Sequence, residues 1–501
     1  MTGGGTGPAA TPGDPSAGPH PRIECSRAPG ATRVRAVAAL GLSAAEAREL
    51  VGALRPAMRE ADLRDEGVHD EDDVPEIMAR CTWSGIAEPG DRVAGAVVGV
   101  LGAAGALTSV VDMRTADGVV GQMVDAGLVL AADDRVALVV EVHAALDRWR
   151  PRVVRSEALA RLRAARAVGA GVLMPGDRAW PGGADDLGSH APLVLWWTGE
   201  ERALAALATS VAVVGARAAT GYGEHVTAEL ASGLVDRGVA IVSGGAYGID
   251  GVAHRAAMAS GGRTVAFLAG GVDRLYPSGH TELFGRMRQE GAIVSELPCG
   301  ASPTRWRFLL RNRLIAAVSS ATVVVEAGAR SGSLNTANHA LALERPLGAV
   351  PGPVTSVSSS GCHRLIRVSG AVCITSPEDA VELVPGWRRI AEEGESGAVG
   401  HSASPAAARR VRASRAAAPG VPAPAPGTTG SVPATAADPT ADPRVTRVLD
   451  ALSLRRARET GEVASRAGLG IAETSSVLGR LELEGHVARP DGGWVRRPSV
   501  R

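Results

Sequence analysis

Short apolar runs alternate with helical patterns between residues 209 and 384. Each run is continuously apolar rather than alternating, which is typical of strands covered on both faces of a sheet. Helical patterns follow most of the runs, so the segment predicts an α/β fold built on a doubly wound, mostly parallel sheet. Ligands of such sheets bind where the strands end. The runs start at Val211, Ala240, Thr264, Ala292, Thr322 and Leu347.

Helical periodicity predicts two further domains. Residues 75–170 carry small apolar residues at helical spacing, which indicates a helical domain of the SAM or helix-hairpin-helix type. Within it, residues 93–111 carry no charge and are long enough to span a membrane. Their Ala and Gly content favours instead a buried helix of a soluble protein, with no membrane association.

The C-terminal segment, residues 442–501, outlines a winged helix. It has three short helical patterns and then a hairpin pattern around Asp491 and Gly492. The helical patterns cover residues 444–453, 460–467 and 472–484.

Two segments have compositions that are unsuited to a packed core. Residues 1–74 begin Gly- and Pro-rich, and residues 60–76 hold nine acids against the single basic residue Arg64. We expect a disordered, acidic extension there and a Pro/Ala-rich linker over residues 389–441. The predicted layout is therefore an extension over 1–74, a helical domain over 75–170, an α/β core over 171–388, a linker over 389–441 and a winged helix over 442–501.

The charge and the number of aromatic rings limit the ways in which the chain can bind a nucleic acid. The 501-residue chain has a formal net charge of zero and no lysine, so all 53 basic side chains are arginine. A neutral chain excludes a globally basic nucleic-acid coat but allows a local basic groove. Anions must then be bound by planar guanidinium groups, and bases must stack on few rings, eight Trp, three Tyr and three Phe.

The cysteines and the first residues indicate the compartment. The five cysteines form no CxxC pair, which argues against a zinc site or a disulfide framework and favours a reducing cytosol. The first residues show neither a basic nor an apolar segment of a signal peptide. We therefore expect a cytoplasmic protein without a metal or cofactor.

Two glycine-rich turns follow the first two strands. Gly215 and Arg217 lie where a strand opens into a helix, an arrangement that can bind an anion, although the glycines can equally serve a tight turn. Ser243 and Gly244 close the second strand and would let a ligand approach the main chain. For Asp250 and His254, which follow, structural roles are favoured over catalytic ones.

The most specific pattern is an acid-free window over residues 297–325. Guanidinium groups, rings and an amide together supply phosphate neutralisation, stacking and edge hydrogen bonds, which single-stranded nucleic acid requires. The alternative is a solvated helix face with the two rings in the core. The cluster consists of Arg305, Trp306, Arg307, Phe308, Arg311, Asn312 and Arg313.

The fourth motif is another turn, which follows the fifth strand. Ser331, Gly332, Ser333 and Thr336 open a helix, and their hydroxyl and N–H groups fit either an anion or ordinary helix capping. The three turns and the arginine-rich window all follow strands of one sheet, so we expect these four motifs to converge on one edge.

The order of these motifs resembles the DNA-processing protein A (DprA, or Smf) family. The resemblance covers residues 172–384 through the stretches VAVVGAR, IVSGGAYGIDGVAH, TVAFLAGGVDRLYP, GAIVSELP, FLLRNRLIAAVSSATVVVEAGARSGSLNTANH and SGCHRLI. The terminal stretch LELEGHVARPDGGWVRR is similar to the family's winged helix. The sequence departs at Ala216, Tyr247 and Leu309, where the family usually has Ser, a basic residue and Pro.

The resemblance implies an extended Rossmann-like domain that binds single-stranded DNA as a homodimer. It further implies a non-enzymatic mediator that helps load the RecA recombinase during DNA uptake and transformation, in competent cells. The implied DNA contacts are Gly215, Arg217, Ser243, Gly244, Tyr247, Phe308, Arg311, Asn312, Arg313, Ser331, Gly332, Ser333 and Thr336.

Two alternatives stay open at this point. A LOG-like nucleotide phosphoribohydrolase uses a related glycine-rich turn, but His339 stands in place of its catalytic glutamate, and Glu326, which ends a strand nearby, is the carboxylate that could act instead. A winged-helix transcription regulator would read duplex DNA, yet the predicted recognition helix carries Glu473, Glu482 and Glu484.

Overall fold

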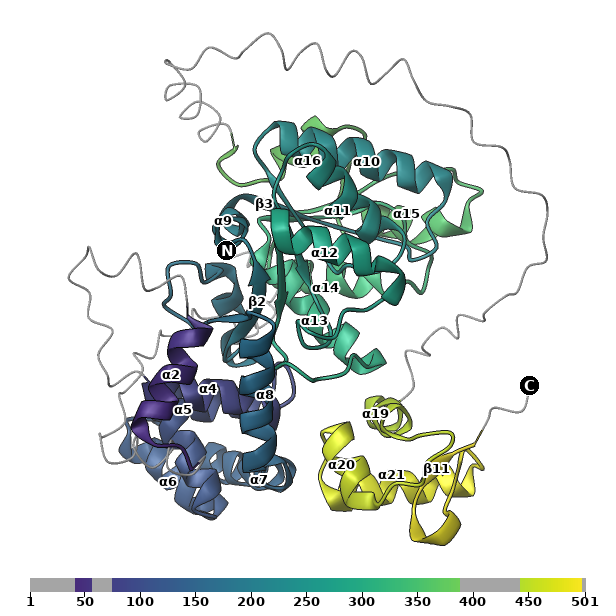
Figure 1. The fold of residues 1–501 in the computed structure, drawn as a ribbon. Coiled ribbons are helices and arrows are strands. Elements are labelled where there is room, and N and C mark those ends of the chain that lie inside the picture. Colours follow the sequence, from purple (N-terminus) through teal and green to yellow (C-terminus); the bar gives the residue numbers. More distant parts are fainter. Residues whose placement is uncertain (1–40, 56–73, 388–441, 498–501) are drawn as a thin grey trace, which may run out of the picture.

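The computed structural model describes residues 41–55, 74–387 and 442–497. Its centre is a nine-stranded sheet with the order β1-β2-β6-β5-β4-β3-β7-β8-β9 (Figure 1). The strands from β6 to β9 in this order are parallel, β2 is antiparallel to β6, and β1 is antiparallel to β2. The bounds are β1 Gly171–Leu173, β2 Leu195–Gly199, β3 Ser210–Val214, β4 Ala240–Ser243, β5 Thr264–Phe267, β6 Ala292–Ser295, β7 Ala321–Val324, β8 Leu347–Ala349 and β9 Val372–Cys373.

The six predicted apolar runs form β3 to β8, which confirms the doubly wound parallel sheet. From β3 the chain adds β4, β5 and β6 on one side, and then crosses back to place β7 on the other side. The crossovers on either side of β3 therefore leave in opposite directions. Such a reversal opens a crevice beyond the carboxyl ends of the strands, where ligands of open α/β sheets bind.

Helices cover both faces of the sheet, which explains why its strands are continuously apolar. One face packs on α10 (Gly221–Asp236), α11 (Ile249–Ala259) and α16 (Pro377–Glu382). The other packs on α13 (Arg305–Val318), α14 (Ser333–Ala342) and α15 (Ser360–Val368). The remaining elements of the core are α9 (Glu201–Ala205), α12 (Thr281–Glu290), η3 (Gly182–His190), η4 (Ala206–Thr209), η5 (Ser278–His280) and η6 (Val357–Ser359).

The N-terminal helices pack beside β1 and β2. They are α2 (Ala44–Leu54), α4 (Val74–Ile86), α5 (Arg92–Val111), α6 (Ala116–Asp125), α7 (Ala132–Trp149), η2 (Arg150–Arg152) and α8 (Arg155–Ala167). In the described part of the chain, α5 is the one helix long and apolar enough to cross a membrane, and 72% of its most apolar window is buried. It bends at Gly102 (φ 71°), where the carboxylate of Glu76 accepts the backbone N–H groups of Ala103 and Ala104.

Helix α2 corrects the expectation of a disordered extension over residues 1–74. Ser43 and Glu46 form a reciprocal capping box at its start, and Ala47, Leu50 and Leu54 are buried. The short amphipathic pattern was hidden between a Gly- and Pro-rich segment and an acidic one. The rest of that expectation, and the linker over 389–441, concern residues outside those described.

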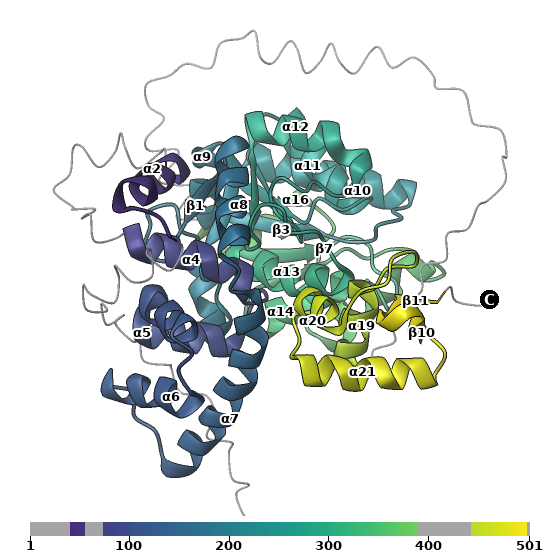
Figure 2. The same ribbon diagram turned by 60° about the horizontal axis from the view of Figure 1, so that its bottom comes forward.

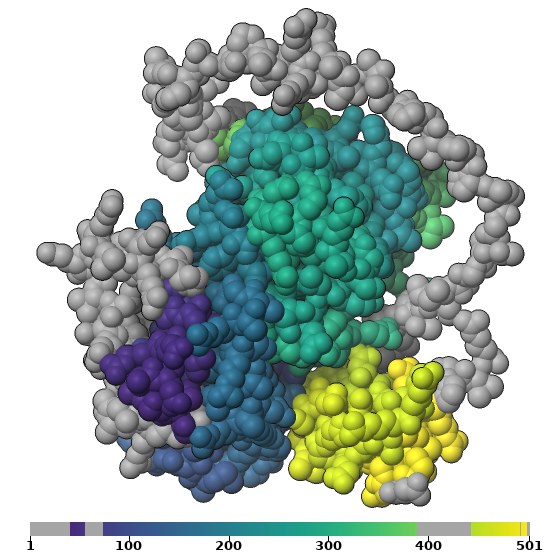
Figure 3. Space-filling model, in the orientation of Figure 1, coloured from purple at the N-terminus to yellow at the C-terminus, as the bar shows by residue number. Residues whose placement is uncertain are grey.

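The C-terminal segment folds as predicted, into three helices and a two-stranded ribbon. These are α19 (Pro443–Ala451), α20 (Thr460–Ala467), α21 (Ile471–Leu483), β10 (Val487–Ala488), η8 (Pro490–Gly492) and β11 (Val495–Arg496). Val448, Leu478 and Trp494 belong to a separate apolar core of this winged helix. The domain lies against α13 of the central domain and beside the N-terminal helices (Figures 2 and 3).

Candidate nucleic-acid interface

The predicted turns meet at one edge of the sheet. Strands β4, β3 and β7 are neighbours and parallel, so the turns at Gly244, Gly215 and Ser331 open on the same side. Helix α13 runs from the end of β6 back to the start of β7, and its first residues therefore lie at this edge as well. We call this edge the rim. The predicted convergence of the four motifs is confirmed.

Phe308 in the first turns of α13 is the centre of a cluster of cations and rings. The guanidinium carbon of Arg217 lies 5.0 Å from the centroid of the Phe308 ring, and that of Arg311 lies 5.9 Å from it. The ring of Tyr276 is 5.7 Å away and 51% exposed. Arg217 is exposed too. The rim therefore presents to solvent the ring of Tyr276 and the guanidinium of Arg217, with the half-buried ring of Phe308 between them.

Arg311 is buried beneath this surface. Its Nη1 donates a hydrogen bond to the carbonyl oxygen of Phe267 at the end of β5, whereas its Nε has no partner. Gly244 makes room for it, because a Cβ there would lie 2.1 Å from Nη1 of Arg311. Burial lowers the pKa of Arg311 to about 10, which still leaves the side chain charged at neutral pH.

The negative charge of Asp250, at the start of α11 after the second glycine-rich turn, lies near the positive charge of Arg311. Its carboxylate accepts the N–H groups of Gly244 at 3.1 Å and of Ala246 at 3.3 Å, which fixes the turn. Burial raises the pKa of Asp250, and the nearby Arg311 opposes that shift. His254, on the same helix, is buried, lies 2.7 Å from Oγ1 of Thr264 through Nδ1, and has its pKa lowered by burial to about 3. Both residues thus make the contacts expected of structural residues.

The start of α10 already holds an anion. Glu326, which follows β7 and is 2% exposed, accepts the N–H of Thr220 at 2.9 Å and its hydroxyl at 2.7 Å. The hydroxyl of Ser358 donates to the same carboxylate at 3.2 Å. The chain thus supplies its own carboxylate at the start of the helix into which Gly215 leads. Arg217 in the same turn stays exposed.

The fourth motif is joined to α13 by an amide. Nδ2 of Asn312 donates to Oδ1 of Asn335 at 3.2 Å, and the hydroxyls of Ser331 and Ser333 lie 2.7 Å apart. Gly332 between these serines is exposed at the rim. The turn is therefore held at a fixed position relative to the Phe308 cluster.

Six of the side chains predicted to contact DNA are buried: besides Arg311, Asn312 and Ser333, these are Ser243, Arg313 and Thr336. The hydroxyl of Ser243 donates to the carbonyl of Val213 at 2.7 Å, and Arg313 pairs with Glu296 at 2.8 Å. Thr336 is buried in α14. These side chains support the rim from below and do not face a bound strand, because neighbouring elements already satisfy or enclose them.

Tyr247 is exposed but lies apart from Phe308. Its hydroxyl accepts the N–H of Gly279 at 3.2 Å, and its ring packs edge-on against His280 with centroids 4.9 Å apart. It therefore belongs to the neighbouring section of the rim, at the loop before α12. Among the described residues, no group of three or more His, Cys, Asp or Glu side chains is placed to hold a metal ion.

Sequence reasoning missed Tyr276 and the role of Glu326. Tyr276 follows β5, so its position near the end of a central strand was a usable signal for a rim residue. Glu326 follows β7 even more closely, but its role could not be foreseen because its partners Thr220 and Ser358 are far away in sequence.

Comparison with known proteins identifies the family. The model named DNA recombination-mediator protein A matches residues 171–385, and that of the DprA winged helix domain matches residues 432–493, together more than half of the chain. The chain belongs to the DprA/Smf family. The expected resemblance is thereby confirmed.

Relatives across bacteria support this membership. A putative DNA processing protein DprA from Mycobacterium tuberculosis is 59% identical over 195 residues, which is 39% of this chain and 50% of the relative. Protein Smf from Escherichia coli is 43% identical over 192 residues, or 38% of this chain and 50% of that protein. The chain thus spans about half the length of these DprA relatives.

Two solved DprA structures are also similar. The protein from Streptococcus pneumoniae has a TM-score of 0.47 and 27% identity, and covers 61% of this chain and 96% of its own. The DprA from Helicobacter pylori has a TM-score of 0.39 and 27% identity, and covers 45% of this chain and 96% of its own. The latter structure is described as showing a single-stranded DNA binding mode.

Proposed function

We propose that this chain binds single-stranded DNA at the rim and acts as a recombination mediator without enzymatic activity. The observation that carries the proposal is the Phe308 ring with the exposed Arg217 on it and Tyr276 beside it. Guanidinium forks bind phosphates and rings stack bases, and this combination suits a single strand with unpaired bases. The exposed Gly332 between the serine hydroxyls extends the surface toward β7.

The family supplies the biological setting of the proposal. Its model is named for a recombination mediator, so we propose that the chain, as a cytoplasmic homodimer, helps RecA recombinase assemble on single-stranded DNA during DNA uptake and transformation. A test adds the chain to RecA and oligonucleotide coated with single-strand-binding protein. Filament assembly should accelerate with wild type and not with a variant that fails to bind DNA.

The structure disfavours a nucleotide phosphoribohydrolase. His339 occupies the place of the catalytic glutamate, and burial lowers the pKa of its imidazole, so that the ring is neutral and cannot stabilise a ribosyl cation as a carboxylate does. Glu326, the carboxylate that ends a strand nearby, is bonded to Thr220 and Ser358. Neither residue supplies the free carboxylate on which that reaction depends.

A regulator that reads duplex DNA is disfavoured by the charges of α21. Glu473, Glu482 and Glu484 lie on its solvent side, with the single arginine Arg480 between them. A major groove is lined by phosphates, and an acidic helix face is repelled there.

The decisive experiment is a binding titration with fluorescein-labelled oligothymidine across a salt series. Phe308→Ala should weaken binding by about 5-fold to 100-fold, because it removes a stacking ring. Arg217→Ala should weaken it less and reduce the salt slope by about one, because it removes one phosphate contact. Arg367→Ala is the matched control, since it removes an exposed arginine on α15 away from the rim.

The proposal fails if Phe308→Ala and Arg217→Ala bind oligothymidine as tightly as wild type and the control. Tighter binding of duplex than of single strand would favour the regulator. Release of a free base from a nucleoside monophosphate would favour the hydrolase.

A further inference from the structure

The winged helix touches the rim through two side chains of α19. The carboxylate of Asp450 accepts the backbone N–H of Arg305, the first residue of α13, at 3.0 Å. The guanidinium carbon of Arg447 lies 5.7 Å from the centroid of the Trp306 ring. The two residues are three apart on one helix, so they face α13 together.

These two contacts reproduce what a nucleotide would offer. The first N–H groups of a helix attract a phosphate, and Asp450 places an anionic oxygen there. An indole surface stacks a base, and Arg447 places a flat cation over it. Arg305 and Trp306 belong to the same acid-free segment as Phe308, one turn nearer to the winged helix.

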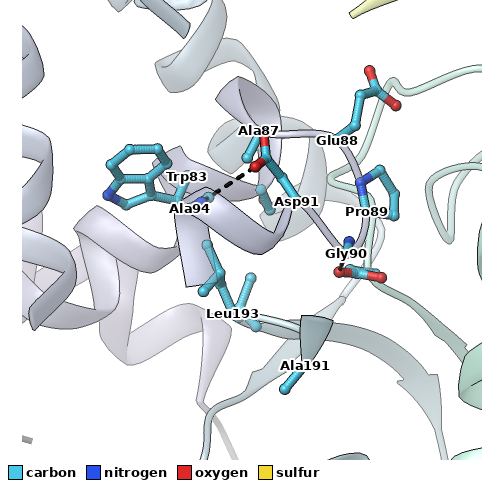
Figure 4. Close-up of a pocket in the computed structure, with 12 residues that line it drawn as sticks. Trp83, Ala87, Glu88, Pro89, Gly90, Asp91, Ala94, Ala191 and Leu193 are labelled. Carbon is cyan, nitrogen blue, oxygen red and sulfur yellow. Dashed lines mark hydrogen bonds between the residues drawn. The ribbon is translucent and has the colours of Figure 1, made fainter. Parts of the chain in front are cut away.

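A second set of contacts holds the winged helix to the N-terminal helices. Nε of Arg152 donates to the carbonyl of Ser465 at 2.9 Å, and Nη2 of Arg152 donates to Glu88 at 2.8 Å. Glu88 also accepts from Arg307 of α13 at 3.0 Å. Figure 4 shows Glu88 on the turn between α4 and α5, where it is one of the residues that line a small pocket with Trp83 and Leu193.

Gly468, which follows α20, allows the end of that helix to lie close to Glu88. It has φ +67°, and a Cβ there would lie 2.5 Å from Cγ of Glu88. Glu88 therefore connects the central domain, the N-terminal helices and the winged helix at one point.

The contacts on α13 can be released without unfolding either partner. The winged helix has its own apolar core, which includes Val448, Leu478 and Trp494, so it does not depend on α13 for its fold. When α19 separates from α13, water can solvate the carboxylate of Asp450, and the guanidinium of Arg447 stays bonded to the carbonyls of Ala467 and Gly468 in its own domain.

We infer that the docked winged helix covers a second nucleotide subsite, formed by the N-terminus of α13 and the ring of Trp306. Asp450 and Arg447 occupy the phosphate and base positions, and an incoming single strand displaces them. This inference rests on the proposed binding of single-stranded DNA at the rim. It assigns the winged helix the role of an intramolecular competitor of DNA.

The test is Asp450→Asn in the full chain. The substitution keeps the shape of the side chain and removes the charge that competes with phosphate, so labelled oligothymidine should bind about 2-fold to 5-fold more tightly. Glu482→Gln is the matched control, because it removes the same charge from an exposed position on α21. It should leave the affinity within the error of wild type.

Hydrogen exchange supplies a readout that needs no DNA. The N–H of Arg305 is protected by Asp450 in the docked state, so the segment around residues 304–308 should exchange faster in Asp450→Asn. Oligothymidine should restore slow exchange in wild type and variant alike, because phosphate then replaces the carboxylate.

The possible outcomes separate this inference from the proposed function. Equal or weaker DNA binding by Asp450→Asn, with wild type still binding, overturns the competitor role and leaves the DNA site in place. Failure of both proteins to bind oligothymidine at low salt overturns the proposed function itself. Faster exchange and tighter binding together support the inference.

Discussion

Two helices begin at the same rim, and a carboxylate occupies the start of each. At α10 the carboxylate is Glu326, which is buried, comes from the core and is bonded to Thr220 and Ser358. At α13 it is Asp450, which is partly exposed and comes from another domain. The two helix starts thus differ in the source of their carboxylate, which is the core of the same domain at α10 and a separate domain at α13.

The largest expected effect separates the two arginines beside Phe308. Arg311→Ala should lower the free energy of unfolding by about 3–5 kcal/mol, because it leaves the buried Asp250 without its counter-charge. Arg217→Ala should change that free energy by about 0.5 kcal/mol or less, since Arg217 is exposed. Urea titrations followed by circular dichroism measure both values. Equal losses of stability in the two variants would show that Arg311 does not belong to the core while Arg217 faces solvent.

A smaller effect compares the two carboxylates directly. Glu326→Ala should cost about 2–3 kcal/mol of stability of the central domain, since three partly buried donors of Thr220 and Ser358 lose their acceptor together. Asp450→Ala should cost about 1 kcal/mol or less, because water can reach the freed N–H of Arg305. The same urea titration decides this point. A loss at Asp450 as large as that at Glu326 would mean that the winged helix is part of the core.

The smallest effect is a pH dependence of the junction around Glu88. Arg307 and Arg152 hold the pKa of Glu88 well below its ordinary value of 4.5, against the opposing effect of burial. The contribution of Glu88 to the free energy of unfolding is therefore complete above about pH 4.5. It is lost as the pH falls toward the lower pKa of the folded state, by up to about 1.4 kcal/mol per pH unit. Stability measured from pH 7 to pH 3 should fall more steeply in wild type than in Glu88→Gln. Parallel curves would contradict this assignment.

Much of the fold could be predicted because its signals are local. The continuous runs at Val211, Ala240 and Thr322 show burial on both faces, and the order of strands and helices then restricts the topology. The edge at which we propose that DNA binds followed from the parallel sheet alone. Helix α2 was missed because its few apolar positions lie between two polar segments.

The candidate site was less predictable because it depends on pairs that are distant in sequence. Arg311 and Arg313 are two residues apart on α13, yet one reaches Asp250 and the β5 carbonyl and the other Glu296. The sequence shows an arginine-rich helix but not which face of it meets a carboxylate. The same holds for Glu326 and Asp450, whose partners become neighbours only after folding.

The guanidinium chemistry of the rim has a consequence for regulation in the cell. Since the chain has no lysine, acetylation of side-chain amines cannot remove positive charge from Arg217, Arg305 or Arg307. Arginine also keeps its charge throughout the physiological pH range. Reversible lysine acetylation therefore cannot tune the attraction of this surface for phosphate, whereas a movement of the domain that carries Asp450 would change the charge that faces Arg305.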